Sequence, residues 1–220
     1  MCSSGAKKPP APAKNSSTPC PLKSVTTRLG KKVDQEMAKC PQFAENIKKL
    51  QDDGWSIEYG EKGKGSYASR TSKKIVIDEN EKGNTAGILE TLAHESGHAM
   101  YTPDPYIPPD GLSKQEYASK NANSDLKDEG EATLVNIEMK KCLKKNGGMN
   151  IGVAGAQSDQ YQKIAKKYPD PQDRDKARQE IGDIFADNEN PSTDPDKTYR
   201  QYYEKTYIDF YEQHHEKKDP

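Results

Sequence analysis

The sequence contains few apolar residues and no long hydrophobic run. Only 31% of its 220 residues are hydrophobic, and another 31% are charged. No stretch approaches the roughly 18 apolar residues that mark a membrane-spanning helix. Residues 1–22 lack the apolar segment of a secretory signal peptide. We therefore expect no membrane span and no general secretion, and we expect part of the chain to lie outside any hydrophobic core.

The chain also lacks an excess of charge of either sign. Its 34 lysines and arginines nearly balance 35 acidic residues, which gives a net charge of −1. Proteins that bind nucleic acid or an anionic membrane usually carry a basic surface. Neither partner is expected here.

Cysteine is scarce, and its spacing is uninformative. The four cysteines form no C-x-x-C pair and no zinc-finger pattern, and they are Cys2, Cys20, Cys40 and Cys142. Cys40 and Cys142 could form a disulfide or remain buried free thiols. The sequence favours neither, so the redox compartment is left open.

Residues 1–22 differ in composition from the rest of the chain. They consist largely of serine, lysine, alanine and proline. Such a segment cannot bury enough apolar surface to fold and is typical of a semi-rigid linker. We predict a flexible arm over residues 1–22 and one folded domain over residues 23–220.

The hydrophobic spacing of the remainder predicts a mainly helical α+β fold. Two helices broken near Pro41 are expected in residues 23–53. Short strands at 55–59, 65–70 and 74–78 are expected to form a small antiparallel sheet. Later helices are predicted over about 85–101, from Ser113 or Ser124 to Lys145, and near 159–167, 173–187 and 197–215. A proline-rich loop at 102–111 is expected to form a wall or lid of the site.

The helix predicted at 85–101 carries His94-Glu95-Ser96-Gly97-His98, an H-E-x-x-H pattern. Two histidines four residues apart share one helix face, so both imidazoles can bind one ion. Neutral imidazole is a preferred zinc ligand. Glu95 then lies beside the metal, where it could accept a proton from an activated water. The sequence predicts a zinc site with Glu95 as general base.

A third protein ligand is expected from the acidic segment Asp128-Glu129-Gly130-Glu131. A zinc site with two histidines and a glutamate takes its carboxylate from a later helix. Glu129 and Glu131 project about 200° apart on one helix, so only one can face the histidines. Alternatively, both glutamates only stabilise the beginning of a helix.

The two motifs together, HESGH followed by EGEA, resemble zincin metallopeptidases of the glutamate-ligand (gluzincin) branch. They are also similar to the small HExxH toxin domains of bacterial polymorphic toxins and type VI secretion effectors. The resemblance covers about residues 45–145. It implies a zincin-like fold with the sheet packed beside the HExxH helix. It also implies Zn²⁺ as cofactor and Glu129 as third ligand, with Ala132 permitting a close approach of the two helices.

The resemblance implies a zinc-dependent peptidase with a protein, peptide or cell-wall peptide as substrate. Its toxin branch implies an antibacterial effector that is cytoplasmic in the producing cell and is then exported by a contact-dependent, type VI-like system. A cognate immunity protein and a secretion carrier that binds the N-terminal arm would be its partners. The alternatives are an intracellular regulatory peptidase that cleaves a repressor and an inactive zincin-like binding module.

A peptidase site also needs a donor for the oxyanion of the transition state. Tyr101 and Tyr106 are candidates because they follow His98 closely in sequence. The tyrosine-rich helix at 197–215 is the alternative source.

Overall fold

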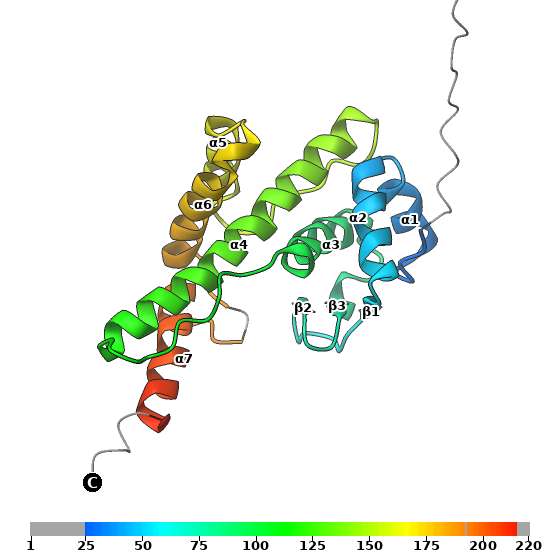
Figure 1. Ribbon diagram of the computed structural model, residues 1–220. Helices are drawn as coiled ribbons and strands as arrows, with labels where there is room; N and C mark the ends of the chain where they lie inside the picture. The colour runs from blue at the N-terminus through cyan, green and yellow to red at the C-terminus, as the bar shows by residue number, and fades with distance from the viewer. Residues whose placement is uncertain (1–24, 192, 215–220) are drawn as a thin grey trace, which may run out of the picture.

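A computed structural model describes residues 25–191 and 193–214 and shows an α+β fold in which helices predominate (Figure 1). The predicted arm at 1–22 lies outside the described residues. The helices are α1 (Lys31–Met37), α2 (Pro41–Asp52), α3 (Thr85–Met100), α4 (Lys114–Lys145), α5 (Ser158–Lys167), α6 (Arg174–Asn188) and α7 (Tyr199–His214). The strands are β1 (Ser56–Tyr59), β2 (Tyr67–Ser69) and β3 (Lys74–Ile77), and two 3₁₀ turns lie at Glu79–Glu81 and Pro171–Asp173.

The N-terminal helices α1 and α2 follow the prediction. Pro41 occupies the first turn of α2, where its missing N–H costs no hydrogen bond. Cys40 caps the same helix, because its Sγ accepts the Phe43 N–H. Gly54 ends it with a φ of 89°.

The sheet differs from the prediction because it is mixed. Its strand order is β1-β3-β2; β2 pairs antiparallel to β3, whereas β1 pairs parallel to β3. The antiparallel expectation assumed that consecutive strands are neighbours. Instead, β1 and β2 are not neighbours. The 60–66 connection leaves a gap between them, and β3 fills that gap and pairs with both. This leaves β2 at an edge, beside α3.

Helix α3 spans the predicted segment and has clear end signals. The Asn84 side chain accepts the Gly87 N–H at its beginning. The helix ends at Met100, shortly before Pro103. Its apolar face lies in a core formed with α1, α2 and the sheet. The prediction for this element is confirmed.

Helix α4, 32 residues long, runs through the centre of the molecule (Figure 1). It begins at Ser113, the earlier of the two predicted starts, where Ser113 and Glu116 form a capping box. Val135 and Met139 pack into the core around α3. Leu134 and Ile137 pack into a second core with α5 and α6. One helix thus serves two cores and fixes their relative position.

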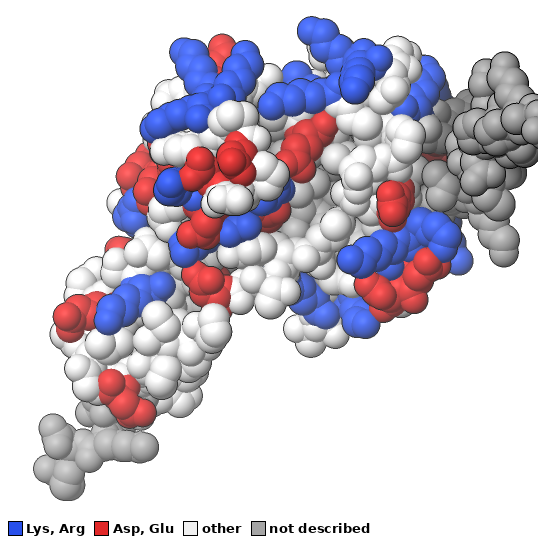
Figure 2. Space-filling view, turned by 45° about the horizontal axis from the view of Figure 1, so that its top comes forward, with Lys and Arg blue, Asp and Glu red and all other residues white. Residues whose placement is uncertain are grey.

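The last helix, α7, lies along α4 near its N-terminal end (Figure 1). No residue of α7, all of which the structure describes, is fully buried. Figure 2 shows basic and acidic side chains together on the visible face, and few charged side chains on the lobe that α7 forms with the beginning of α4. Helix α7 thus packs on α4 without burying any of its residues fully.

Cys40 and Cys142 form a disulfide, which resolves the alternative that the sequence left open. The bond joins the beginning of α2 to the last part of α4 across 102 residues. The segment that it closes contains His94, His98 and Glu129. The disulfide therefore encloses the part of the chain that carries every candidate metal ligand.

The helices of the described residues include none that is both long enough and apolar enough to cross a membrane. Although α4 is long, its lysines and acidic residues recur along its whole length.

Candidate metal centre

Helix α3 places His94 and His98 next to each other on one face. Their ring centroids are 4.9 Å apart and the rings are nearly perpendicular. His94 is buried and His98 is largely buried. The four-residue spacing thus has the geometric result that the sequence predicted.

Helix α4 supplies the third group by crossing α3 at very short range. A Cβ at Gly97 would lie 2.5 Å from the Cα of Ala132. Because no side chain larger than hydrogen fits at position 97, the glycine of HESGH permits this crossing. The crossing brings Glu129 to the histidines: its Oε2 lies 3.5 Å from His94 Nε2 and 3.4 Å from His98 Nε2.

These three side chains form a group that could hold a metal ion. Their donor atoms all lie within 4.8 Å of one another. Ligands bonded at about 2.0–2.1 Å in tetrahedral geometry lie about 3.3–3.4 Å apart, close to the two histidine–carboxylate distances. Those distances exceed the usual range of N–H···O hydrogen bonds, so the groups approach at ion-pair distance without closing on one another. The donor set and its spacing fit a metal.

Asp128 supports His98 from behind. Its Oδ1 lies 2.9 Å from His98 Nδ1, so the imidazole is fixed with Nε2 directed toward Glu129. Arg70, which follows β2, donates to both oxygens of Asp128 at 2.7–2.8 Å and also to the backbone carbonyl of His98. A carboxylate behind a metal-binding imidazole fixes its tautomer and raises its basicity.

His94 has no such support. Its Nδ1 is buried and has no hydrogen-bond partner among the described residues. The two histidines therefore differ: Asp128 holds the Nδ1 of His98, whereas no described residue bonds the Nδ1 of His94.

The protonation of the cluster follows from its burial and its charges. Burial by itself lowers the pKa of His98, but Glu129 and Asp128 outweigh it and hold the pKa well above the ordinary value. Burial raises the pKa of Glu129, but the two histidines outweigh it and hold the pKa far below the ordinary value. Without a metal, the site therefore holds a proton on His98, and a metal ion must displace it.

Glu131, the rival third ligand, faces away from the histidines. Its carboxylate accepts hydrogen bonds from Arg174 and Arg178 of α6 at 2.7–3.1 Å. The intervening Gly130 packs against the backbone of Arg178, where a Cβ would lie 2.1 Å from the carbonyl oxygen. In EGEA, Glu129 and Ala132 thus face α3, whereas Gly130 and Glu131 contact α6.

Glu95 lies beside the ligands and is buried. Burial raises the pKa of its carboxyl group, and the neighbouring His98 and His94 oppose that rise. A carboxylate that binds a proton more readily than usual suits a general base near neutral pH.

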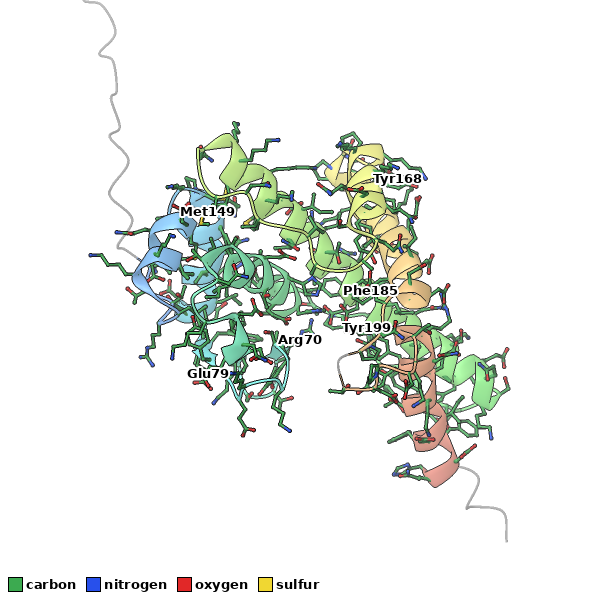
Figure 3. The ribbon with its side chains drawn as sticks, turned by 180° about the vertical axis from the view of Figure 1, so that it is seen from behind. Arg70, Glu79, Met149, Tyr168, Phe185 and Tyr199 are labelled. Atoms are coloured by element: carbon green, nitrogen blue, oxygen red, sulfur yellow. A yellow bond between two sulfur atoms is a disulfide. The ribbon has the colours of Figure 1, made fainter. Side chains whose placement is uncertain are left out.

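A pocket of about 310 Å³ opens onto these residues. Its walls come from the β2 segment, α3, α4, the connection after α6 and the beginning of α7. Arg70 and Tyr199, both labelled in Figure 3, line the pocket from the sheet and from α7. Three residues of α7 contribute: Tyr199, Tyr202 and Tyr203.

Tyr203 contacts one of the candidate metal ligands directly. Its hydroxyl donates to Glu129 Oε1 at 2.9 Å. Burial and the adjacent Glu129 raise the pKa of Tyr203 well above its ordinary value, so the phenol stays protonated as the donor. The sequence suggested the C-terminal helix as a source of a tyrosine but did not identify this residue or its partner.

Neither Tyr101 nor Tyr106 lines the pocket. The Tyr101 ring lies under the Arg178 guanidinium, with 4.6 Å between the guanidinium carbon and the ring centroid. The Tyr106 hydroxyl pairs with that of Tyr117 at 3.0 Å, and its side chain is exposed. Proximity in sequence was a poor guide because the backbone turns away after Met100.

The loop at 102–111 also lies apart from the pocket, contrary to the expected wall or lid. It packs along the N-terminal half of α4, where the Ile107 N–H donates to Asn121 at 2.9 Å. Asp104 pairs with Lys127 on the same helix. The connection after α6, with Pro191 and Thr193, forms a pocket wall instead.

Arg70 and Asp128 were not identified as site residues from the sequence. Asp128 carried a weak signal because it precedes Glu129, but Arg70 lies 58 residues away from it and shows no motif. Compared with protein-family models, with curated proteins and with solved structures, the chain matches none of them, so the geometry of the site carries the functional argument.

Proposed function

We propose that this protein is a zinc-dependent peptidase that uses Glu95 as its general base. One observation carries the proposal: the side chains of His94, His98 and Glu129 converge at 3.4–3.5 Å beside a buried glutamate and an open pocket. Two imidazoles and one carboxylate are the ligands of many catalytic zinc sites, which keep a fourth position open. A purely structural zinc site would be closed by a fourth protein ligand.

Zinc is the metal that this donor set favours. Two neutral nitrogen donors and one oxygen donor suit zinc, whereas calcium and magnesium require mostly oxygen ligands. The two histidine–carboxylate distances, 3.5 and 3.4 Å, are close to those between zinc ligands and support the same choice. Bound zinc would polarise the substrate carbonyl and lower the pKa of a water molecule in the pocket.

The chain itself supplies the proton transfers. Glu95 accepts a proton as the water oxygen adds to the amide carbon, and it then delivers that proton to the nitrogen as the C–N bond breaks. The products are a carboxylic acid and an amine. The raised pKa of Glu95 supports both steps, because the group must bind the proton and release it again.

A peptide is the substrate that the pocket walls favour. Strand β2 is at the edge of the sheet, and Ser66, Tyr67 and Ala68 line the pocket. The outer edge of a strand can pair with an extended peptide through backbone hydrogen bonds. Tyr67 is half exposed beside this edge and could contact substrate side chains.

The oxyanion donor is best sought in α7. Tyr203 is committed to Glu129, but the hydroxyls of Tyr199 and Tyr202 make no hydrogen bond to described residues. Both residues line the pocket. We propose that one of them donates to the developing oxyanion.

The disulfide favours a role outside a reducing cytoplasm. Disulfides persist mainly in oxidising compartments such as the bacterial periplasm. We propose an antibacterial effector that acts in the oxidising periplasm of a target cell, where the disulfide would persist, with a cognate immunity protein in the producing cell. The disulfide argues against a cytoplasmic peptidase that cleaves a repressor.

The proposal is tested by the turnover of an unfolded protein and of a mixed peptide library with zinc-loaded protein. Glu95→Gln should keep the metal, because it changes no ligand, and should lower hydrolysis by roughly 10²- to 10⁴-fold. Glu90→Gln, on the same helix but bonded to the backbone of Gly152, is the matched control and should stay active. Zinc-loaded wild-type protein without hydrolysis on any peptide would favour an inactive binding module.

A further inference from the structure

Helix α7 presents a row of tyrosines to α4 at four-residue intervals. Tyr203 donates to Glu129 at 2.9 Å, and Tyr207 donates to Asp125 at 2.9 Å. The two donors are one helical turn apart, and so are the two acceptors, in the opposite order along the chain. The helices therefore run antiparallel, joined by two equivalent phenol–carboxylate bonds.

One of these two acceptors is a candidate metal ligand. Tyr203 binds Oε1 of Glu129, whereas Oε2 of the same carboxylate faces the two histidines. The phenol thus occupies one oxygen and leaves the other for a metal. Asp125 has no such second role, because it is not among the clustered donor atoms.

Besides these two bonds, α7 is held on α4 by an aromatic cluster around the buried Tyr117. None of the residues of α7 is fully buried. Its other contacts include an exposed ion pair between Arg200 and Asp187 and the packing of Tyr199 on Phe185. Exposed ion pairs contribute little to stability, whereas hydrogen bonds to charged groups are stronger than neutral ones.

We propose that Tyr203 is a positioning residue for Glu129 and that metal binding and the docking of α7 on α4 are therefore coupled. The inference rests on the proposed metal site. When Tyr203 holds Oε1, the carboxylate cannot rotate and presents Oε2 to the metal. When a metal holds Oε2, the carboxylate is fixed as an acceptor for Tyr203. Coupling between two binding events is reciprocal, so each stabilises the other by the same factor.

The coupling assigns a role to α7 in the reaction. Tyr199, Tyr202 and Tyr203 form part of the pocket wall, so the metal and the wall assemble together. Loss of the metal loosens α7 and opens the pocket. The substrate pocket is then complete only in protein that also holds the metal.

The test compares Tyr203→Phe with Tyr207→Phe in the full chain. Each substitution removes one hydroxyl from the same helix, but only the first removes a contact to a metal ligand. Zinc affinity is measured by competition with a chromogenic chelator. Loss of an outer contact to a ligand typically costs 10- to 100-fold in affinity. We expect a loss of about 10-fold for Tyr203→Phe and less than about 3-fold for Tyr207→Phe.

Two further readouts separate positioning from general destabilisation. The visible absorption of the Co²⁺-loaded protein reports ligand geometry and should change in Tyr203→Phe only. Zinc should slow hydrogen exchange of the α7 amides by about 10-fold in the wild type and in Tyr207→Phe. In Tyr203→Phe, zinc should slow exchange in α3 but no longer in α7.

The outcomes distinguish this inference from the proposed function. Wild-type zinc affinity and an unchanged cobalt spectrum in Tyr203→Phe would overturn the inference and leave the metal site intact. Equal losses in both variants would overturn the assignment of Tyr203 as the positioning residue, because zinc affinity would then depend on how firmly α7 is docked and not on the hydroxyl that binds Glu129. A wild-type protein that binds no zinc would instead remove the proposed function itself.

Discussion

The Nδ1 of His98 lies 2.9 Å from a carboxylate oxygen of Asp128, while the other ring nitrogen, Nε2, is directed toward Glu129. Arg70 holds that carboxylate through two hydrogen bonds and also binds the His98 backbone carbonyl. The sheet, α3 and α4 therefore meet at one charged triad. Its position beside the candidate ligands connects the fold to the metal site.

Replacing Asp128 with asparagine should weaken zinc binding by 10- to 100-fold, the usual cost of losing a carboxylate behind a metal-binding histidine. The amide lacks the charge that keeps His98 basic. Zinc affinity by chelator competition is the measurement. Asp104→Asn, which alters only an ion pair with Lys127, is the control and should bind as the wild type does. Equal affinities for wild type and Asp128→Asn would show that the triad has no effect on the metal.

Substitutions of the two glutamates of EGEA should have different effects, one on zinc binding and the other on stability. Glu129→Ala should lose zinc, because only the two histidines remain. Glu131→Ala should keep zinc but lower the free energy of unfolding by about 1–3 kcal/mol, since it leaves Arg174 and Arg178 without their shared partner. Metal content and urea denaturation measure the two effects. Zinc loss in Glu131→Ala with retention in Glu129→Ala would reverse the assignment.

The local elements of this fold were predictable, whereas the contacts between them were less so. Apolar spacing, Pro41 and the capping residues defined α2, α3 and α4, because these signals act within one helical turn. The parallel pairing of β1 and β3 was not predicted, since β3 lies between two strands that both precede it in the sequence, and spacing within one strand does not show which strands become neighbours.

The site shows the same division. His94, Glu95 and His98 lie within one turn and could be found by spacing alone. Glu129 needed a family resemblance, because it comes from a second helix. Arg70 and Tyr203 reach the site only through tertiary packing and have no motif, so sequence spacing could not identify them.

The disulfide predicts that the protein loses stability under reducing conditions. A closed loop of about 100 residues is worth about 2–5 kcal/mol, mainly because it restricts the unfolded chain. Reductant should lower the free energy of unfolding of the wild type by this amount, and the urea midpoint should fall with it. Reductant should leave Cys142→Ser, which cannot form the bond, unchanged. An unaffected wild type would show that Cys40 and Cys142 are not joined in solution.

Asp125 predicts a pH dependence of stability. Burial raises the pKa of Asp125 to about 6, and the Tyr207 hydrogen bond opposes that rise. A raised carboxyl pKa means that the folded protein binds the proton more tightly than the unfolded chain does. The contribution of this bound proton to the free energy of unfolding is therefore complete below about pH 4 and is lost as the pH rises through about 6.

Asp125→Asn should remove this dependence. From pH 4 to pH 7.5 the wild type loses this contribution and the variant does not. The free energy of unfolding of the variant minus that of the wild type should therefore rise by about 1–3 kcal/mol over this range. Urea denaturation of both proteins at several pH values measures the difference, and effects of other groups cancel in it. A difference that stays constant with pH would contradict a raised pKa for Asp125.

The metal centre is tested by the metal content of the purified protein after exhaustive dialysis, determined for the wild type, His94→Ala and His98→Ala. We expect one zinc per wild-type chain and strongly reduced occupancy in both variants, because each retains only two ligands. A wild-type chain that binds no zinc, or alanine variants that retain it fully, would contradict a metal centre formed by His94, His98 and Glu129.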